Sequence, residues 1–333
     1  YTPMKKLVSM LLALTLVLIM GCAQAEDSTS ETTAVRIGAL KGPTSMGMAQ
    51  MLKDAADGNS NYQFTIAGAP DEITALLVKG ELDVAAVPSN LASVLYNNTN
   101  GGVKVAMINT LGILYVVEAG DTVNSVADLK GRTVYSSGKG ATPEYSVDYI
   151  LSQNGIDPET DVTVEFKSEH TELAAALQSG TADLAVLPEP FVTTVLAGND
   201  NLRVALNLNE EWDKVSDGSG MVTGVLVVRS EFAEQHPDEL TALLEAYEQS
   251  VNFVNENPAE AAAIIEQNGI AKAAVAEQAI PKCNIVFISG NEMRTKVEGF
   301  LEILFDMNPK AVGGALPGDD FYYGADAVQA EAA

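Results

Sequence analysis

Lys139 is a charged side chain whose surroundings suggest ligand chemistry. It lies in a Gly-rich loop, residues 136–143, directly before an expected helix. Its ammonium group and the free N–H groups of that helix start would suit an anion such as a sulfonate, a phosphate or a carboxylate. The alternative is that Lys139 is an ordinary solvated loop lysine.

Glu189 is the second such side chain. It follows an apolar stretch and precedes Pro190 at the start of another expected helix. Its carboxylate could bind an amine or a protonated ring nitrogen, or it could only stabilise the helix dipole, a contribution of about 0.3–1 kcal/mol. If Lys139 and Glu189 face the same cleft, they could also pair with each other.

Two strand–loop–helix units would position such residues. The first has a strand at 35–40, a loop at 41–45 and a helix at 46–53, and the second has a strand from Thr133, the loop 136–143 and a helix at 144–154. The N–H groups of each helix start point toward whatever lies above the strand. Thr44 or Ser45 could cap the first helix or turn a hydroxyl group toward a ligand.

Other polar and aromatic residues have a mainly structural interpretation. Gly68 ends a strand and permits a close backbone approach, and Asp71 is the expected N-cap of a helix at 72–78. We expect His170 to lie at the surface or to cap a helix. We expect Trp212 to anchor an irregular Gly-rich segment.

One stretch of the chain occurs twice, one hundred residues apart. Residues 77–95 read LVKGELDVAAVPSNLASVL and residues 177–195 read LQSGTADLAVLPEPFVTTV. Each copy predicts a helix end, a Gly stop, a short buried strand and a Pro that starts the next helix. The residue after the shared Pro is Ser89 in one copy and Glu189 in the other. The repeat predicts two similar lobes that offer a strand end and a helix start to a shared cleft.

The order of the segments predicts an α/β fold with two lobes, each a mixed sheet flanked by helices. Lobe one is residues 34–114 plus 225–333, and lobe two is residues 118–220. Two strands, at 112–118 and 224–229, cross between the lobes. Such a two-strand hinge would let the lobes close around a ligand.

Composition excludes some classes of function. The chain has 333 residues, 47% of them hydrophobic, and a net charge of -26, so it can build real cores but lacks the basic face that nucleic-acid binding needs. Apart from Cys22 the chain holds one cysteine, Cys283, in an apolar stretch where a buried structural thiol is expected. The two histidines are isolated in the sequence. We therefore expect no metal site, no cofactor and no catalytic residue.

The N-terminal segment is typical of an exported lipoprotein. Lys5 and Lys6 precede an apolar run at 7–20, which is the length of a signal-peptide core and short for a spanning helix. Residues 19–22, at the end of this run and just after it, read Ile-Met-Gly-Cys, which resembles the bacterial lipobox. We expect residues 4–22 to be a lipoprotein signal peptide ending at a lipidated Cys22, and residues 23–33 to be a flexible tether.

Several further segments carry a resemblance to a known family. They are IGALKGPTSMGMAQML at 37–52, SVADLKGRTV at 125–134 with the Gly-rich loop after it, LQSGTADLAVLPEPFV at 177–192 and NPKAVGGALPGDDFYY at 308–323. With the lipobox, they make the chain resemble the solute-binding components of ABC importers that have the type II periplasmic-binding-protein fold. The chain is most similar to the branch that binds aliphatic sulfonates, taurine, nitrate and pyrimidine precursors of thiamine.

The resemblance implies a ligand site between the lobes, on loops at the carboxyl ends of strands. The switch-point rule for open α/β sheets leads to the same place. The residues expected to contact the ligand are Lys41, Pro43, Thr44, Ser45, Gly68, Asp71, Ser89, Asn90, Lys139, Ala141, Thr142, Glu189 and Thr223.

The leading hypothesis is a binding protein, anchored by lipid on the extracytoplasmic face of the cell membrane, that delivers a small organic anion or zwitterion to an ABC permease and its ATPase. A sulfonate or a pyrimidine-like compound would suit the site. The protein would act as a monomer and would not bind nucleic acid. Two alternatives stay open: an enzyme on the same fold, such as a chorismate dehydratase-like lyase, or a lipoprotein that senses its ligand.

Overall fold

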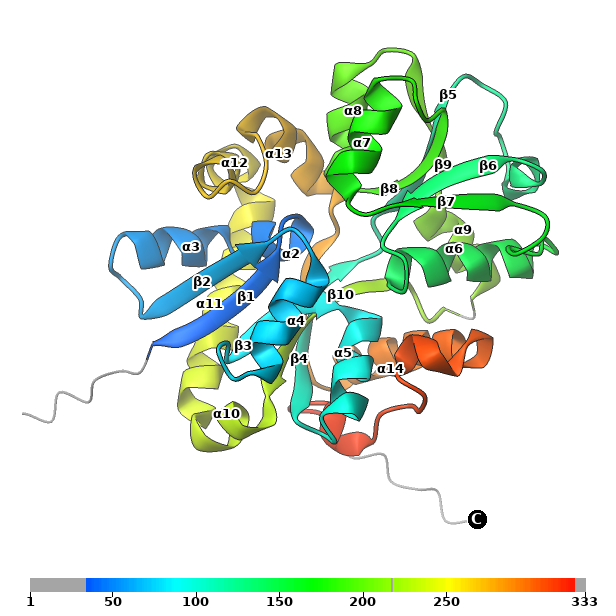
Figure 1. Cartoon of the computed structure of the whole chain (residues 1–333). Coiled ribbons are helices and arrows are strands. Elements are labelled where there is room, and N and C mark those ends of the chain that lie inside the picture. The colour runs from blue at the N-terminus through cyan, green and yellow to red at the C-terminus, as the bar shows by residue number, and fades with distance from the viewer. Residues whose placement is uncertain (1–33, 217, 327–333) are drawn as a thin grey trace, which may run out of the picture. The chain divides into compact units, whose positions relative to one another are not determined.

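The computed structural model describes residues 34–216 and 218–326, which belong to one compact unit. They form two sheets with helices on both faces of each (Figure 1). Among these residues, no helix combines the length and the hydropathy needed to cross a bilayer.

The first sheet has six strands in the order β11-β4-β10-β3-β1-β2. Strands β1, β2 and β3 run parallel, and β10 is antiparallel to both of its neighbours. The strands are β1 (Val35–Leu40), β2 (Tyr62–Ala67), β3 (Val84–Pro88), β4 (Val103–Leu111), β10 (Val222–Arg229) and β11 (Ile285–Ile288).

Helices cover this sheet on two sides because its central strands are apolar on both faces. Val84 and Ala86 of β3 pack into one core cluster, and Ala85 and Val87 pack into another. The first cluster includes residues of α3 (Ala49–Ala56), α10 (Ser230–Gln235), α11 (Pro237–Glu256), α12 (Pro258–Gln267) and α13 (Ala273–Ala279). The second cluster includes residues of α4 (Pro70–Val78), α5 (Ser89–Asn98) and α14 (Gly290–Met307).

The second sheet has five strands in the order β7-β6-β8-β5-β9. They are β5 (Leu114–Ala119), β6 (Thr133–Ser137), β7 (Thr163–Lys167), β8 (Leu184–Pro188) and β9 (Leu202–Asn207). One face packs on α7 (His170–Gln178) and α8 (Phe191–Gly198), and the other on α6 (Thr142–Gln153) and α9 (Leu208–Val215). We call each sheet with its helices a lobe. The two-lobed fold expected from the sequence is thereby confirmed.

The sequence repeat corresponds to equivalent structure in the two lobes. β3 and β8 each end in Pro at the same repeat position, and α4 and α7 span residues 70–78 and 170–178. Both strands lie beside a strand that runs antiparallel to them, β10 in the first lobe and β5 in the second. The chain passes from β4 to β5 through Gly112 and Ile113 and returns from α9 to β10, whose first residue pairs with Leu111.

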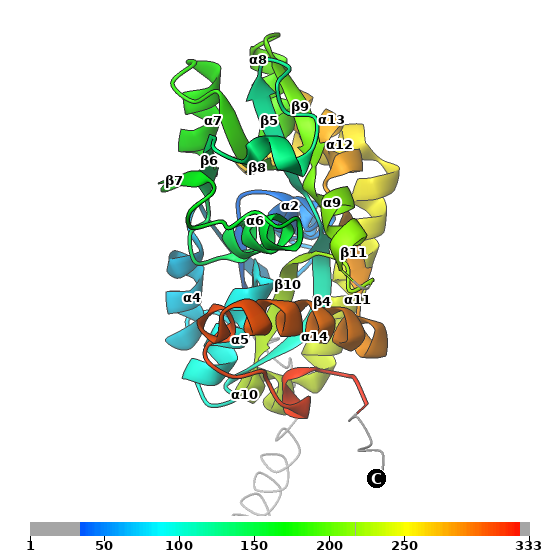
Figure 2. The same cartoon turned by 90° about the vertical axis from the view of Figure 1, so that its right-hand side faces the viewer.

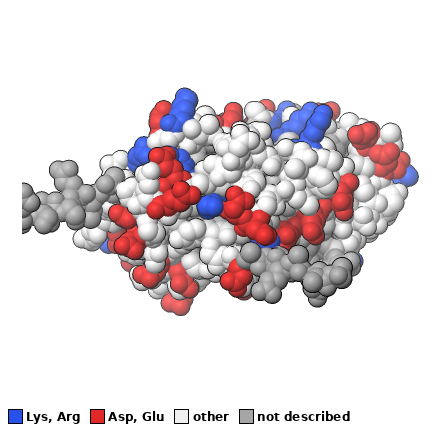
Figure 3. Space-filling model, turned by 90° about the horizontal axis from the view of Figure 1, so that it is seen from below, with Lys and Arg blue, Asp and Glu red and all other residues white. Residues whose placement is uncertain are grey.

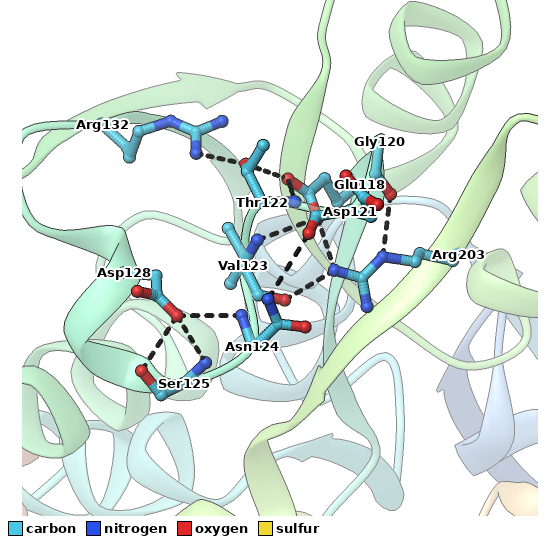
Figure 4. Close-up of polar contacts among 10 residues, drawn as sticks. All are labelled: Glu118, Gly120, Asp121, Thr122, Val123, Asn124, Ser125, Asp128, Arg132 and Arg203. Carbon is cyan, nitrogen blue, oxygen red and sulfur yellow. Dashed lines mark hydrogen bonds and ion pairs between the residues drawn. The ribbon is translucent and has the colours of Figure 1, made fainter.

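Polar contacts around Glu118 and in the segment that follows it hold the turns between β5 and β6 (Figure 4). The buried Glu118 carboxylate accepts hydrogen bonds from the backbone N–H groups of Thr122 and Val123 and pairs with Arg203 at 2.8 Å. Ser125 and Asp128 form a capping box around the 3₁₀ turn η1 (Val126–Leu129). The segment at 125–134, which the chain shares with the family it resembles, therefore shapes the turns between β5 and β6 and does not contact the expected ligand site.

Some local predictions were wrong. The helix expected at 46–53 is split into α2 (Pro43–Met46) and α3, because Pro43 starts a helix early and Gly47, packed against Ile285, ends it. Asp71 is not an N-cap: α4 begins at Pro70, its N-cap is Ala69, and Asp71 lies in the first turn.

Four further elements differ from the sequence prediction. The segment around Trp212 is a helix, α9, whose start the Asn207 side chain caps by accepting from the Asn209 N–H. The strand expected at 112–118 begins at Leu114 and so belongs wholly to the second sheet. β11 and α13 were not predicted. Three 3₁₀ turns complete the C-terminal part: η2 (Ile280–Lys282), η3 (Pro309–Val312) and η4 (Asp319–Phe321).

Candidate functional site

A pocket of about 890 Å³, part of it open to solvent, is lined by residues of both lobes. The first lobe contributes Leu40, Lys41, Gly42, Pro43, Thr44, Gly68, Ala69, Pro70, Pro88, Thr223 and Gly224, the connection between the sheets contributes Ile113, and the second lobe contributes Leu114, Gly138, Ala141, Thr142, Pro143, Ser168, Glu169, His170, Pro188, Glu189 and Phe191.

Five helices of eight residues or more begin at this pocket. The cap or first-turn residues of α4, α5, α6, α7 and α8 are among those that line it. Among the described residues, none of the five has a hydrogen bond from an N-cap side chain. The partial positive charge and the N–H groups of several helix starts therefore meet at the pocket.

Glu189 is the buried acid of the pocket, with 1% of its surface exposed. Its carboxylate accepts hydrogen bonds from the backbone N–H and the hydroxyl group of Thr193, both at 3.1 Å, in the first turn of α8. Burial raises the pKa of Glu189, although the bonds from Thr193 oppose that shift. Glu189 thus stabilises a helix start and also lines the pocket.

His170 lines the pocket, although we expected it to lie at the surface or to cap a helix. It is the first residue of α7, its ring lies 5.3 Å from that of Phe191, and its Nδ1 lies 2.5 Å from the Ser137 hydroxyl oxygen. Burial lowers the pKa of His170 from 6.5 to about 4, so the ring is neutral near pH 7. Ser137 itself is buried and does not line the pocket.

Eight of the thirteen residues expected from the sequence line the pocket: Lys41, Pro43, Thr44, Gly68, Ala141, Thr142, Glu189 and Thr223. Among them, Thr223 has a buried hydroxyl group with no hydrogen-bond partner among the described residues. Since a buried polar group without a partner is costly, this hydroxyl group is suited to a ligand or a water molecule.

The other five residues do not line the pocket. Ser45 and Ser89 are buried, and their hydroxyl groups donate to the carbonyl groups of Gly42 and Val222. The amide group of Asn90 bonds with protein groups, and Asp71 is exposed in the first turn of α4.

Lys139 also lies outside the lining. Its ammonium group lies 5.6 Å from the centre of the Phe166 ring, a cation–π contact. The pairing of Lys139 with Glu189 that the sequence allowed is not formed, since Glu189 bonds with Thr193 instead.

Of the two cysteines, the structure describes only Cys283. Cys22 and its lipobox lie outside the described residues. Cys283 is buried, and burial raises its pKa well above the ordinary value of a thiol, so it behaves as a structural side chain. Within residues 34–216 and 218–326, no cluster of His, Cys, Asp and Glu could hold a metal ion.

Comparison with known proteins connects the chain to a family. A family model described as "ABC transporter, phosphonate, periplasmic substrate-binding protein" matches residues 47–279. The protein YtlA of Bacillus subtilis (strain 168) is 28% identical over 131 residues, a match that spans 38% of this chain and 38% of YtlA.

Two solved structures share the fold. A crystal structure of an ABC transporter from Parabacteroides distasonis is similar with a TM-score of 0.72 and 27% identity, over 87% of this chain and 98% of that chain. The periplasmic aliphatic sulphonate binding protein SsuA from Escherichia coli is similar with a TM-score of 0.70 and 17% identity, over 90% of this chain and 94% of that chain. Since the family model covers more than half of the sequence, the chain belongs to the family of phosphonate-type periplasmic substrate-binding proteins of ABC transporters.

Proposed function

We propose that the protein binds a small organic anion, best matched by a zwitterion, in the pocket between its lobes and delivers it to an ABC permease. The observation that carries this proposal is one pocket lined by the starts of five helices and by the buried acid Glu189. These features favour an acid group and an amine on one small molecule.

The acid group would bind at the helix starts near His170. If the Ser137 hydroxyl group donates to Nδ1 of His170, the proton of the neutral ring lies on Nε2, which can then donate to an anion. The Thr142 N–H of α6 and the first-turn N–H groups of α7 add further donors without a formal charge. A phosphonate or a sulfonate fits this set of donors.

The acidic surface of the protein does not oppose an anionic ligand. The net charge is -26, and acidic side chains are spread over the face drawn in Figure 3. Charges on the surface are screened by salt over about 8–10 Å. The local donors of the pocket therefore dominate the binding of an anion.

The amine would bind at Glu189. A cation placed beside this buried carboxylate would lower its pKa again and offset part of the cost of its burial. The Thr223 hydroxyl group, which lacks a partner among the described residues, would accept or donate one further hydrogen bond.

Delivery to a permease and attachment to the membrane belong to the same proposal. Family membership supports the delivery. Lys5, Lys6, the apolar run at 7–20 and Cys22 support a lipid anchor on the extracytoplasmic face. Labelled fatty acid should be incorporated into the protein but not into Cys22→Ala, and equal labelling of the two proteins would contradict the anchor.

A thermal-shift screen tests the proposed ligand class. Phosphonates, sulfonates, amino acids, pyrimidines and inorganic anions would each be added to the purified protein, since a ligand that binds the folded state raises its midpoint of unfolding. We expect aminoalkyl phosphonates or sulfonates to stabilise the protein more than the same acids without the amine. A preference for neutral pyrimidines would contradict the proposal.

A further inference from the structure

Asn90 connects the two lobes beside the pocket. It lies in the first turn of α5 in the first lobe and is fully buried. Its amide nitrogen donates to the carbonyl oxygen of Gly140, in the second lobe, at 3.2 Å. Its amide oxygen accepts from the Thr142 hydroxyl group, also in the second lobe, at 3.3 Å.

The same amide group is fixed within its own lobe. The amide nitrogen of Asn90 also donates to the carbonyl oxygen of Ala311, in η3, at 3.1 Å. Both N–H bonds and the oxygen of the side chain are therefore used, so the side chain has one favoured orientation. Asn90 holds the start of α6 against the first lobe.

The loop that Asn90 holds is part of the pocket wall. Gly138, Ala141 and Thr142 line the pocket, and Gly140 and Thr142 are the two partners of Asn90 in that loop. A separation of the lobes by about 1 Å would carry these bonds past 3.5 Å, where a hydrogen bond is lost. The bonds therefore require one relative position of the lobes.

A second contact between the lobes is of a different kind. The ring of Trp212 in α9 lies 5.2 Å from the ring of Phe300 in α14, which runs beside α5 (Figure 2). Trp212 does not line the pocket. An apolar contact of this type tolerates sliding better than a set of directional hydrogen bonds.

We propose that Asn90 is a latch between the lobes, a positioning residue that sets the place of the 138–142 loop. It favours the arrangement described above, in which both lobes line one pocket, and we call this arrangement the closed form. This role goes beyond solute binding and does not depend on which solute is bound. Loss of the latch shifts the equilibrium between closed and open forms toward the open form.

The chain offers a matched control on the same helix. The amide nitrogen of Asn97 donates to the carbonyl oxygens of Val312 and Ala315, both at 2.8 Å and both in the first lobe. Asn97→Ala therefore removes two bonds to the C-terminal segment but none between the lobes. Thr142→Val removes one bond of the latch and keeps the shape of the side chain.

The test measures the distance between the lobes in solution, with no solute added. Spin labels are placed at Lys79→Cys in the first lobe and Ser179→Cys in the second, two exposed positions at equivalent places in the repeat. The background carries Cys22→Ser, and Cys283 is buried. Pulsed electron–electron double resonance then gives the populations of short and long distances between the two spin labels for each variant.

The latch predicts a distinct result for each variant. In Asn90→Ala, the ratio of long to short distances rises about fivefold or more, as expected for the loss of at least one net hydrogen bond. Thr142→Val gives a smaller rise, and Asn97→Ala leaves the populations unchanged.

The inference is overturned if Asn90→Ala gives the populations of the unmodified protein, or if Asn97→Ala shifts them as much. If Asn90→Ala does not fold, Thr142→Val decides the question alone, and unchanged populations in that variant overturn the latch. A failure of the ligand screen leaves all of these outcomes intact.

Discussion

The equivalent residues Ser89 and Glu189 show how one side chain changes a site. Ser89 is short, and its hydroxyl group donates to the carbonyl oxygen of Val222 within the first lobe. Glu189 is longer, so its carboxylate bonds with Thr193 and still lines the pocket. The two lobes share a backbone plan, and the difference at this position gives the pocket its buried acid.

His170 predicts that anion binding depends on pH. Its pKa of about 4 keeps the ring neutral at pH 7, and an anion beside the ring would raise that pKa. Binding then takes up a proton, so the affinity for an anionic solute should rise as the pH falls from 7 to 5. Titration calorimetry in buffers of different ionisation enthalpy measures that uptake.

The control for this prediction is His170→Gln, which keeps a polar side chain but cannot titrate. The groups that share the pocket with His170 and could also titrate or carry charge are Lys41, Glu169 and Glu189. If the proton uptake persists in His170→Gln, one of those carboxylates is its source and the role of His170 is wrong.

The sequence predicted some pocket-lining residues better than others for a physical reason. Thr44, Thr142 and Glu189 follow directly from strand–loop–helix order, because helix starts after parallel strands meet at one edge of a sheet. His170 was missed because its burial comes from Ser137 and Phe191, which are distant from it in the sequence. No pattern in the sequence around His170 predicts those two contacts.

At the scale of elements, Gly112 is the critical residue of the connection between the sheets. A Cβ atom at Gly112 would lie 2.8 Å from Cγ of Asn209. The carbonyl oxygen of Gly112 accepts a hydrogen bond from the Asn284 side chain at 2.5 Å. Asn209 in turn accepts from the Leu114 N–H at 3.3 Å. The connection is therefore held on two sides.

Gly112→Ala is expected to destabilise the protein by about 1–3 kcal/mol, because Asn209 must move and its hydrogen bonds are lost. Urea unfolding measures the change. Gly299→Ala is the control: it lies inside α14, meets only ordinary contacts, and should stabilise the protein by about 0.5–1 kcal/mol. Equal stability of Gly112→Ala and the unmodified protein would contradict this account of the connection.

Element boundaries could be predicted where local signals agree. The repeat predicted a short strand before Pro88 and Pro188, and β3 and β8 are those strands. The prediction that each Pro starts the next helix was wrong, because each Pro is the last residue of its strand and the helices begin at Ser89 and Phe191.

The single-helix prediction over 46–53 failed because Pro43 starts a short helix early and the chain leaves the helical path at Gly47 and Met48 before α3 begins. The tight contact that a Cβ at Gly47 would make with Ile285 of β11, far away in the sequence, favours Gly at this break. β11 was missed because its four residues are a strand only through pairing with β4.

For the whole molecule, each lobe has a buried carboxylate at the end of the sheet away from the pocket. Asp83 pairs with Arg36 and Arg229, and Glu118 pairs with Arg203. Burial alone would raise the pKa of both acids, but hydrogen bonds and these arginine partners hold each pKa below its ordinary value.

These two acids predict a loss of stability in acid. The unfolded chain takes up protons as the pH falls through about 4–4.5, while the folded protein keeps both carboxylates charged to lower pH. Their contribution is therefore complete above the unfolded pKa values and disappears as the pH falls through the lower, folded values. Urea unfolding at several pH values between 3 and 7 measures this dependence.

Glu118→Gln is the variant that isolates one of these acids. It should lower the free energy of unfolding at pH 7 by about 2–3 kcal/mol, because Arg203 loses its charged partner, and should flatten the acid dependence. Glu165→Gln, an exposed acid on β7, serves as the matched control and should change little. An unchanged slope in Glu118→Gln would show that Glu118 does not cause the acid sensitivity.

We propose above that the pocket between the lobes binds a zwitterion, with Glu189 as the partner of its amine. The most direct measurement is titration calorimetry of Glu189→Gln and the unmodified protein with the best zwitterion from the screen. A Gln at this position can accept from the Thr193 N–H through its amide oxygen and donate to the Thr193 hydroxyl oxygen through its amide nitrogen. Because it also removes a buried charge, the variant should be at least as stable at pH 7. We predict an affinity at least about tenfold weaker, equivalent to about 1.4 kcal/mol. Equal affinities in the two proteins would contradict the claim.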